Sequence, residues 1–446
     1  MKGIRFIRSL YLTQRLFYAL AVISVGFLFS YWFPALYLVS WLCLWGLFLV
    51  FLLDVTVLYK NKEGIVARRL LPEKFSNSDL NEVPVEVKNN YAFAIHINAI
   101  DEIPVQFQKR DFSKELDIPA RTRKRFHYEL QPHERGEYVF GNLNLYVNTR
   151  ISLAVRRYTF EKDQMVKVYP SFIQMKKYAF LAIDNKLSQY GLKKIRRLGH
   201  TMEFEQIKDY VTGDDVRTIN WKATAKRANL MVNQYQDEKS QPIYSVIDAS
   251  RMMKMPFEGL TLLDYAINST LAFSNVALKK GDKTGMVTFA HTILNHLGAS
   301  SKKTHLNTIM EVLYNINTKF LDSDYGRLYA EIKRKITHRS LILLYTNFEH
   351  ITGLERQLPY LKGIARRHVL VVIFFENTEL EDLISKKATS TTTVYHKAIA
   401  QKFEYDKKLM VKELEKHGIQ TVLTKPEDLT VKTINKYLEI KARGIL

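Results

Sequence analysis

The first sixty residues contain one long apolar run. No charged residue occurs between Arg15 and Asp54, and this run is too long for one membrane crossing, because a transmembrane helix needs about 20 residues. A turn near residues 30–34, with Pro34 opening the second segment, divides the run. The pattern predicts a transmembrane helical hairpin over residues 1–58, with helices at about 16–33 and 35–53.

Basic residues flank the apolar run on both sides. They are Lys2, Arg5, Arg8 and Arg15 before it and Lys60, Lys62, Arg68 and Arg69 after it. The positive-inside rule therefore places both ends of the hairpin, and everything that follows, in the cytoplasm, where anionic lipid headgroups lie near these side chains. A signal peptide is the competing interpretation, but it would have one short apolar core and a small-residue cleavage site.

Short alternating runs such as VPVEVKNN, FAIHINAI and GEYVFGNLNLYV fill residues 59–170, separated by Gly, Pro, Asn and Asp. Period-two alternation at this spacing predicts an antiparallel β-sandwich of immunoglobulin-like size, with no helix longer than a turn.

A different rhythm begins near residue 241. Apolar strand-like runs such as IYSVID, SLILLYT and VLVVIFF alternate with helical stretches up to residue 446, including a long helix near 392–417. This pattern predicts a doubly wound, Rossmann-like α/β domain with a mostly parallel sheet. Residues 171–240 form a connecting segment, and its helix-compatible part, 171–200, ends in dense basic residues that suit a solvated face or contact with headgroups.

Composition bounds the class of protein. A chain of 446 residues, 47% hydrophobic, is long enough for two or three domains with cores of their own. The formal charge of +21 favours an anionic partner, which is nucleic acid, an acidic protein or the inner leaflet of a membrane. Cys43 is the single cysteine, so an intrachain disulfide and a cysteine-rich zinc site are excluded.

The stretch GHTMEFEQIKDYVTGDDVRTINWKATAKRANLMVNQYQDEKSQPIYSVIDASRMM resembles the signature of the domain of unknown function 58 family, and the upstream HERGEYVFGNLNLYV resembles that family's sandwich domain. The resemblance implies a membrane-tethered protein whose α/β domain is similar to a von Willebrand A domain. It also implies a gene commonly found beside a MoxR-type AAA+ ATPase, and no known reaction.

The resemblance to a von Willebrand A domain implies a Mg²⁺ site. In such domains the ligands come from a DxSxS pattern in one loop, a threonine in a second loop and an aspartate in a third. This sequence keeps Asp248 and Ser250, and Thr304 is the candidate for the second-loop hydroxyl. Met252 and Asn347 depart from the pattern and remove a hydroxyl and a charge, which weakens Mg²⁺ binding. The alternative for Asp248 and Ser250 is a strand-end turn, and we expect no cofactor.

The motif GDDVRTINWKATAKR lies directly before the strand-like run IYSVID. We interpret it as a structural lock between two domains, in which acid–arginine pairs fix the path and a large aromatic residue anchors it. The residues concerned are Gly213, Asp214, Asp215, Arg217, Trp221 and Lys222. Catalysis by the two neighbouring aspartates and contact with nucleic acid are the alternatives, although neighbours on a strand face opposite ways and no nucleic-acid-binding module surrounds them.

The sequence contains no GxxxxGK[ST], HExxH, GxSxG or GxGxxG motif. We therefore predict a non-enzymatic adaptor in a bacterial inner membrane, with its soluble domains in the cytoplasm. Its partner-binding face comprises Asp248, Ser250, Met252 and Asn347, and the predicted partner is a MoxR-type AAA+ ATPase. The alternatives are a metal-dependent hydrolase that uses the Asp248 loop and a membrane-proximal binder of nucleic acid or another polyanion.

Overall fold

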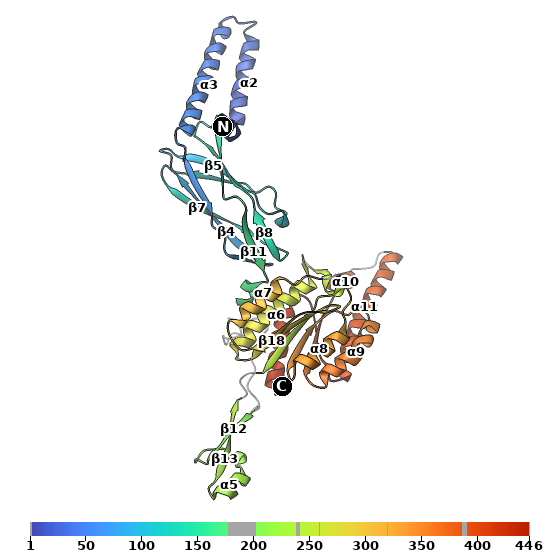
Figure 1. The fold of residues 1–446 in the computed structure, drawn as a ribbon. Coiled ribbons are helices and arrows are strands. Elements are labelled where there is room, and N and C mark those ends of the chain that lie inside the picture. The colour runs from blue at the N-terminus through green and yellow to red at the C-terminus, as the bar shows by residue number, and fades with distance from the viewer. Residues whose placement is uncertain are drawn as a thin grey trace. The chain divides into compact units, whose positions relative to one another are not determined.

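The structure is a computed structural model that describes residues 2–176, 202–237, 241–257, 259–318, 320–385 and 390–445 (Figure 1). The chain divides into two compact units, Met1–Val168 and Tyr169–Leu446. The predicted helix-compatible stretch 171–200 lies outside the described residues from position 177 onward.

Unit 1 begins with three helices, α1 (Lys2–Ser9), α2 (Gln14–Phe29) and α3 (Ala35–Lys60). Among the described residues, α3 is the one helix that is long and apolar enough to cross a membrane, and α2 is a shorter apolar helix of 16 residues. The two lie side by side, with the ring of Phe27 packed edge-on against Trp41 (Figure 1). The second helix continues seven residues beyond the predicted end at 53, because the apolar pattern resumes after Asp54.

Antiparallel strands make up the rest of unit 1. One sheet has the order β1-β10-β9-β5-β6, a second β2-β4-β7 and a third β3-β11-β8. The strands are β1 (Leu10–Leu12), β2 (Ile65–Arg69), β3 (Lys74–Ser76), β4 (Asn81–Asn89), β5 (Ile95–Asp101), β6 (Lys114–Ile118), β7 (Arg123–Leu130), β8 (Gly136–Phe140), β9 (Leu143–Asn148), β10 (Ala154–Phe160) and β11 (Gln164–Tyr169). Alternate side chains of β4 and β5 are buried, as period-two alternation predicts.

A buried ion pair joins two of these sheets. The guanidinium of Arg69, on β2, donates to both carboxylate oxygens of Asp101, on β5, and both side chains are fully buried. The hydroxyl of Tyr128, on β7, donates to the same carboxylate. Burial raises the pKa of Asp101, and the charge of Arg69 opposes this rise.

Helix α3 is bonded to the strands through Asp54, which is only 1% exposed. Its carboxylate accepts hydrogen bonds from the backbone amides of Leu153 and Ala154, both at 3.0 Å, and from the hydroxyl of Thr149. At the carboxyl end of α3, Arg156 donates to the backbone oxygens of Leu58 (2.6 Å) and Asn61 (2.7 Å). These hydrogen bonds therefore attach the carboxyl-terminal half of α3 to the strands of unit 1.

The body of unit 2 is a six-stranded sheet with the order β18-β17-β14-β19-β20-β21. Its strands are β14 (Pro242–Asp248), β17 (Lys283–Phe289), β18 (Ile293–Ser300), β19 (Leu341–Tyr345), β20 (Val369–Phe375) and β21 (Gln420–Thr424). All neighbours are parallel except β17 and β18. The parallel strands are almost continuously buried, because helices cover both faces.

One face of this sheet packs against α6 (Leu262–Lys279), α7 (His305–Tyr314) and α12 (Leu429–Ala442), and the other against α8 (Tyr325–Lys335), α9 (Ile351–Ala365) and α11 (Thr391–Lys416). The short helix α10 (Thr378–Ser385) follows β20. The coarse prediction of an apolar N-terminal helix followed by mixed α/β structure with several sheets is confirmed.

A small hairpin also belongs to unit 2. Strands β12 (Met202–Asp209) and β13 (Met231–Asp237) pair antiparallel, and the turn η3 (Val216–Thr218) and helix α5 (Trp221–Arg227) lie between them. This hairpin contains the GDDVRTINWKATAKR motif.

Candidate functional site

The carboxyl ends of β14 and β19 meet at the point where the strand order reverses direction. Asp248 is the last residue of β14, and Thr346 follows β19 directly. These two strands are parallel neighbours, with Ile247 opposite Tyr345. In open α/β sheets ligands bind outside the carboxyl ends of the strands at such a point. We call this end of the sheet, around Asp248 and Thr346, the carboxyl edge.

Asp248 ties three loops together here. Its Oδ1 accepts hydrogen bonds from the amide of Ser250 (2.9 Å) and the hydroxyl of Ser323 (2.6 Å), and its Oδ2 accepts one from the hydroxyl of Thr346 (2.8 Å). Burial raises the pKa of the Asp248 carboxyl, and these donors oppose the rise. No cationic side chain of the described residues contacts Asp248. The hydrogen bond from the amide of Ser250 closes a turn at the end of β14.

The two other residues of the predicted DxSxS pattern differ in their surroundings. The hydroxyl of Ser250 is buried and has no hydrogen-bond partner among the described residues. Met252 lies half-buried on the short helical turn η4 (Arg251–Lys254). Ser250 thus has an unused hydroxyl, and Met252 offers an apolar side chain in place of a second one.

The prediction that Thr304 supplies the second-loop hydroxyl is wrong in this structure. Strand β18 runs antiparallel to β17 and brings Ser300 opposite Thr284, at the amino end of the parallel strands. Thr304 follows it, exposed, at the opposite edge from Asp248. Ser323 supplies the hydroxyl instead, from the loop that leads into α8.

Asn347 is bonded to a lysine. Lys407, on α11, donates from Nζ to the side-chain oxygen of Asn347 (2.7 Å) and to the backbone oxygen of Phe348 (2.6 Å). Burial lowers the pKa of Lys407 to about 8, and Glu349 opposes this shift. The position at which the family pattern has an aspartate is thus an amide that already accepts from an ammonium group.

This donor set does not fit Mg²⁺. The carboxylate of Asp248 accepts three hydrogen bonds, and the oxygen of Asn347 faces the cation of Lys407. No group of three His, Cys, Asp or Glu side chains suited to a metal ion occurs in the parts of the chain that the structure describes. A divalent ion that binds chiefly through charge would meet one carboxylate and one ammonium group.

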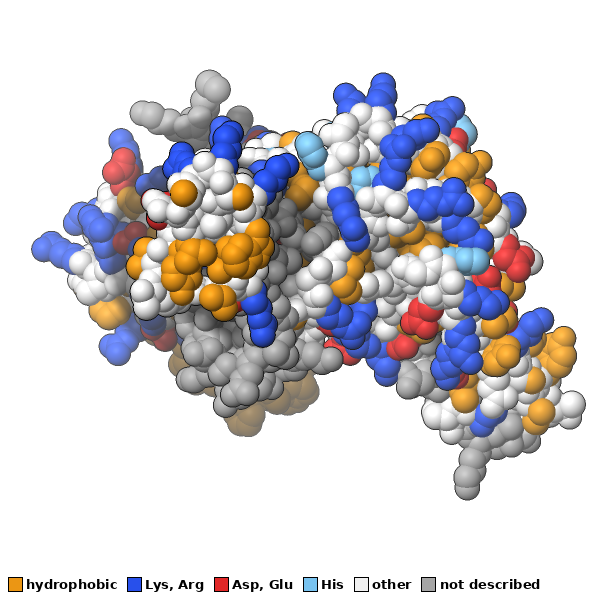
Figure 2. Space-filling model, turned by 90° about the horizontal axis from the view of Figure 1, so that it is seen from below, with side chains coloured by type: hydrophobic (Ala, Val, Ile, Leu, Met, Phe, Trp, Pro, Cys, Tyr) orange, Lys and Arg blue, Asp and Glu red, His pale blue; other side chains and the backbone are white. Residues whose placement is uncertain are grey.

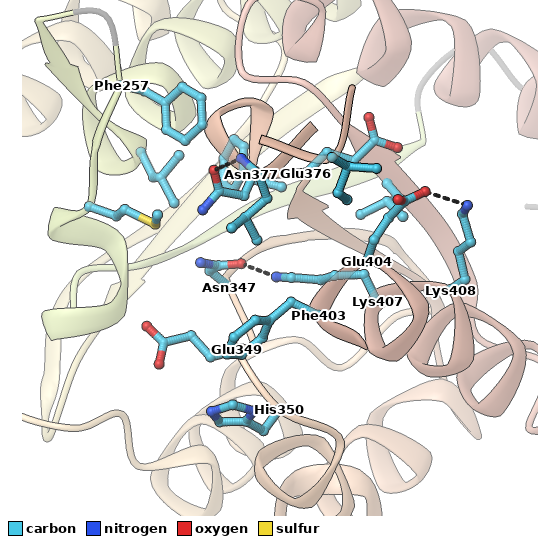
Figure 3. Close-up of a pocket in the computed structure, with 16 residues that line it drawn as sticks. Phe257, Asn347, Glu349, His350, Glu376, Asn377, Phe403, Glu404, Lys407 and Lys408 are labelled. Atoms are coloured by element: carbon cyan, nitrogen blue, oxygen red, sulfur yellow. Dashed lines mark hydrogen bonds and ion pairs between the residues drawn. The ribbon is translucent and has the colours of Figure 1, made fainter. Parts of the chain in front are cut away.

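A pocket of about 470 Å³ opens beside this cluster (Figure 3). Asn347 and Lys407 line it and are hydrogen-bonded to each other, and Glu404 and Lys408 form an ion pair along α11. Its apolar walls come from four parts of the edge and consist of Met255, Phe257, Leu262, Phe375, Leu380, Ile384, Phe403 and Leu423. A preformed apolar pocket with a few converging polar groups is the usual form of a binding site.

The polar side chains that line the pocket are carboxylates, amides, lysines and His350. No serine, threonine or cysteine is among the described residues that line it.

Exposed apolar side chains lie next to the Asp248 cluster. Phe320 is 67% exposed and Leu321 53% exposed, in the loop that supplies Ser323. The amide of Arg251 donates to the backbone oxygen of Leu321 (3.2 Å), and the ammonium of Lys254 lies 3.9 Å from the centre of the Phe320 ring. These contacts hold the loop against η4 and present both apolar side chains to solvent.

Comparison with known proteins supports the resemblance that the motifs predict. Residues 206–394 match the family described as "Protein of unknown function DUF58". We call the residues that match this family model the DUF58 segment. An uncharacterized protein, YeaD, from Bacillus subtilis strain 168 is 24% identical over 256 residues, which are 56% of this chain and 62% of that protein. The chain thus spans less than two thirds of this relative.

Two solved structures show weak similarity. The conserved hypothetical protein BatB from Bacteroides thetaiotaomicron has a TM-score of 0.31 at 13% identity and covers 46% of this chain and 99% of its own. The ASH/PapD-like domain of human CEP192 has a TM-score of 0.19 at 8% identity and covers 24% of this chain and 87% of its own. Scores of this size carry no argument about function.

The DUF58 segment begins in β12 and includes the motif predicted to lock two domains. Asp214 pairs with Lys208 (3.1 Å), and the side chain of Asp215 accepts from the amide of Arg217 (2.9 Å), so the acids fix the local turn. Trp221 is 69% exposed and Lys222 is also exposed, and Gly213 has a φ of +111°. The predicted acid–arginine pairs and the predicted aromatic anchor are not confirmed.

Proposed function

We propose that this protein is a membrane-anchored, non-enzymatic adaptor. In this proposal α2 and α3 are a two-helix anchor in a bacterial inner membrane, and the soluble parts of both units lie in the cytoplasm. The support is the apolar hairpin with basic residues on both flanks. The hydrogen bonds of Asp54 and Arg156 would hold the sandwich strands at the membrane surface.

We further propose that unit 1 contains an immunoglobulin-like sandwich and that unit 2 is a von Willebrand A-like domain. Numbered along the chain, the sheet of unit 2 has the order 3-2-1-4-5-6, with the third strand antiparallel. This is the order of a doubly wound fold, and it places Asp248 at the reversal point.

The partner would bind at the carboxyl edge. The observation that carries this proposal is the apolar pocket of about 470 Å³, next to the exposed side chains of Phe320 and Leu321. Exposed apolar side chains beside a recess are typical of protein interfaces, and here Met252, Asp248 and Ser250 adjoin them. Because the donor set does not fit Mg²⁺, we propose binding without a resident metal.

The partner that we propose is a MoxR-type AAA+ ATPase, which would supply the energy to assemble or activate a client complex. The DUF58 segment supports this proposal through the family resemblance alone. An ATPase of this type works in the cytoplasm, so the proposal requires the carboxyl edge to face the cytoplasm.

Affinity capture from native membranes tests the proposal. Full-length tagged protein would be crosslinked with and without ATP, and the proteins captured with it identified. We expect an AAA+ ATPase that is captured in an ATP-dependent way and lost in the double variant Phe320→Ser, Leu321→Ser. The control is Tyr360→Ser, which removes an exposed aromatic ring from helix α9. Equal capture by both variants, or no ATPase, would contradict the proposed site.

A further inference from the structure

The DUF58 segment has a second exposed surface at the tip of the β12–β13 hairpin, which comprises residues 210–230. Its backbone is fixed by its own polar groups. The backbone amide of Asn220 donates to the backbone oxygen of Met231 (2.8 Å). The side-chain oxygen of Asn220 accepts from the backbone amide of Ala223 (3.0 Å), and this hydrogen bond caps α5. The carboxylate of Asp214 accepts from the amide of Val211 (3.1 Å) and from Lys208. The tip therefore has a defined shape.

This tip exposes apolar side chains although the hairpin buries others. Met231 and Val232 are buried, whereas Trp221, Val216, Val211 and Leu230 are 69%, 64%, 62% and 46% exposed. The amide of Tyr210 donates to the backbone oxygen of Leu230 (2.8 Å), which brings Val211 and Leu230 to the same end of the hairpin. Exposed apolar groups that are concentrated in this way mark interaction sites.

Basic side chains surround these apolar groups. Lys222 and Lys226 are four positions apart and share one exposed face of α5, next to the face that Trp221 shares with Ala225. Arg217 is exposed on the preceding turn. Figure 2, in which this tip points toward the viewer, shows an apolar patch with Lys and Arg side chains at its rim.

We infer that the tip is a docking site for a protein that presents an acidic surface with an apolar recess for Trp221. A central tryptophan within a polar rim is the usual anatomy of an interface hot spot. This site is separate from the carboxyl edge and does not depend on the function proposed for that edge.

The details of the tip favour a protein over a polyanion. Val211, Val216 and Leu230 offer neither a flat ring for stacking on bases nor a donor for phosphate. Asp214 and Asp215 lie in the same turn and would repel the phosphates of a nucleic acid or of anionic lipids. A protein surface can meet apolar groups and both signs of charge together.

Photocrosslinking in living cells tests this inference. A photoreactive phenylalanine analogue would replace Trp221 or Ala225 in the full-length protein, and Arg227, on the other side of α5, in the control. We expect adducts with one and the same protein from Trp221 and Ala225, linked through a segment rich in Asp and Glu, and much weaker adducts from Arg227.

Charge reversal by Lys222→Glu and Lys226→Glu should reduce these adducts by about tenfold or more, because like charges then face each other. An unchanged thermal unfolding temperature would show that the doubly substituted variant is folded. Adducts with lipid or nucleic acid, the absence of a common protein, or protein adducts that do not respond to charge reversal would each overturn the inference.

Discussion

Two buried aspartates, one in each unit, are stabilised in different ways. Asp101 in unit 1 faces the guanidinium of Arg69 and the hydroxyl of Tyr128, whereas Asp248 in unit 2 faces only hydroxyls and a backbone amide. Asp101 holds strands of two sheets together, and Asp248 holds three loops at the edge of one sheet. Burial raises the pKa of both carboxyls, but a fixed cation opposes that rise only at Asp101.

This difference indicates that Asp101 stabilises the core of unit 1, whereas Asp248 positions surface loops of unit 2. An ion pair buried between sheets tolerates no loss of one partner, because the other charge then stays buried without compensation. Hydroxyl donors can rotate when their acceptor changes, so a loop cluster can adapt. At the carboxyl edge of unit 2 the hydrogen bonds of Asp248 therefore hold the loops in place, and their hydroxyl donors can still adjust to a changed acceptor. Both properties suit the proposed binding face.

The largest effect is expected from Asp101→Asn. The substitution leaves the buried charge of Arg69 without a counter-ion and should lower the free energy of unfolding of unit 1 by about 3–5 kcal/mol. Hydrogen exchange of the β5 and β7 amides in the full-length protein would measure this loss. The control is Asp117→Asn, an exposed carboxylate paired with His96, where we expect less than about 1 kcal/mol. Equal effects at both positions would contradict the structural role of Asp101.

A smaller effect is expected from Lys407 as the pH changes. Its folded pKa of about 8 lies below its ordinary value, so above pH 8 the folded state binds fewer protons than the unfolded state, and stability rises with pH. Between pH 8 and about 10.4, unit 2 should gain up to about 3 kcal/mol relative to Lys407→Met. Thermal unfolding of both proteins across this range would check it, and parallel pH profiles would contradict the burial of the ammonium group.

Asp248→Asn should cost only about 1 kcal/mol, because the surrounding hydroxyls can reverse their direction of donation. Since burial raises the folded pKa of Asp248, the wild type should gain stability relative to this variant as the pH falls. Hydrogen exchange of the β14 and β19 amides would measure both effects. A cost as large as that of Asp101→Asn would remove the distinction between the two aspartates.

The smallest effect is expected from Mg²⁺. An ion present at 100 times its Kd stabilises a folded domain by about 2.7 kcal/mol. We expect 10 mM Mg²⁺ to leave the melting temperature of unit 2 unchanged to within about 1 °C, in the wild type and in Asp248→Asn alike. A rise of several degrees in the melting temperature that disappears in Asp248→Asn would show that Mg²⁺ binds at Asp248 and would contradict this expectation.

Apolar patterning located most elements of unit 2 from the sequence. The run VLVVIFF is β20, and the long helix predicted near 392–417 is Thr391–Lys416. The site was harder to predict, because it depends on strand direction. Thr304 was chosen from its residue type, but β18 is antiparallel and carries it to the other edge, a reversal that the apolar pattern does not encode.

The surroundings of three residues could not be predicted from the sequence, for separate reasons. Ser323 lies in the stretch DSDYG, which gives no local sign of contact with Asp248. Lys407 is one of 66 basic residues, and only the packing of α11 makes it half-buried beside Asn347. Trp221 was predicted from its size to anchor the motif against a domain surface, whereas it lies exposed on a short helix.

The central claim is that the carboxyl edge of unit 2 faces a cytoplasmic machine, and the side of the membrane on which the carboxyl terminus lies tests it most directly. The full-length protein would be fused at this terminus, in turn, to a fluorescent protein that matures only in the cytoplasm and to a phosphatase that is active only outside it. We predict fluorescence and no phosphatase activity. Phosphatase activity without fluorescence would contradict the account.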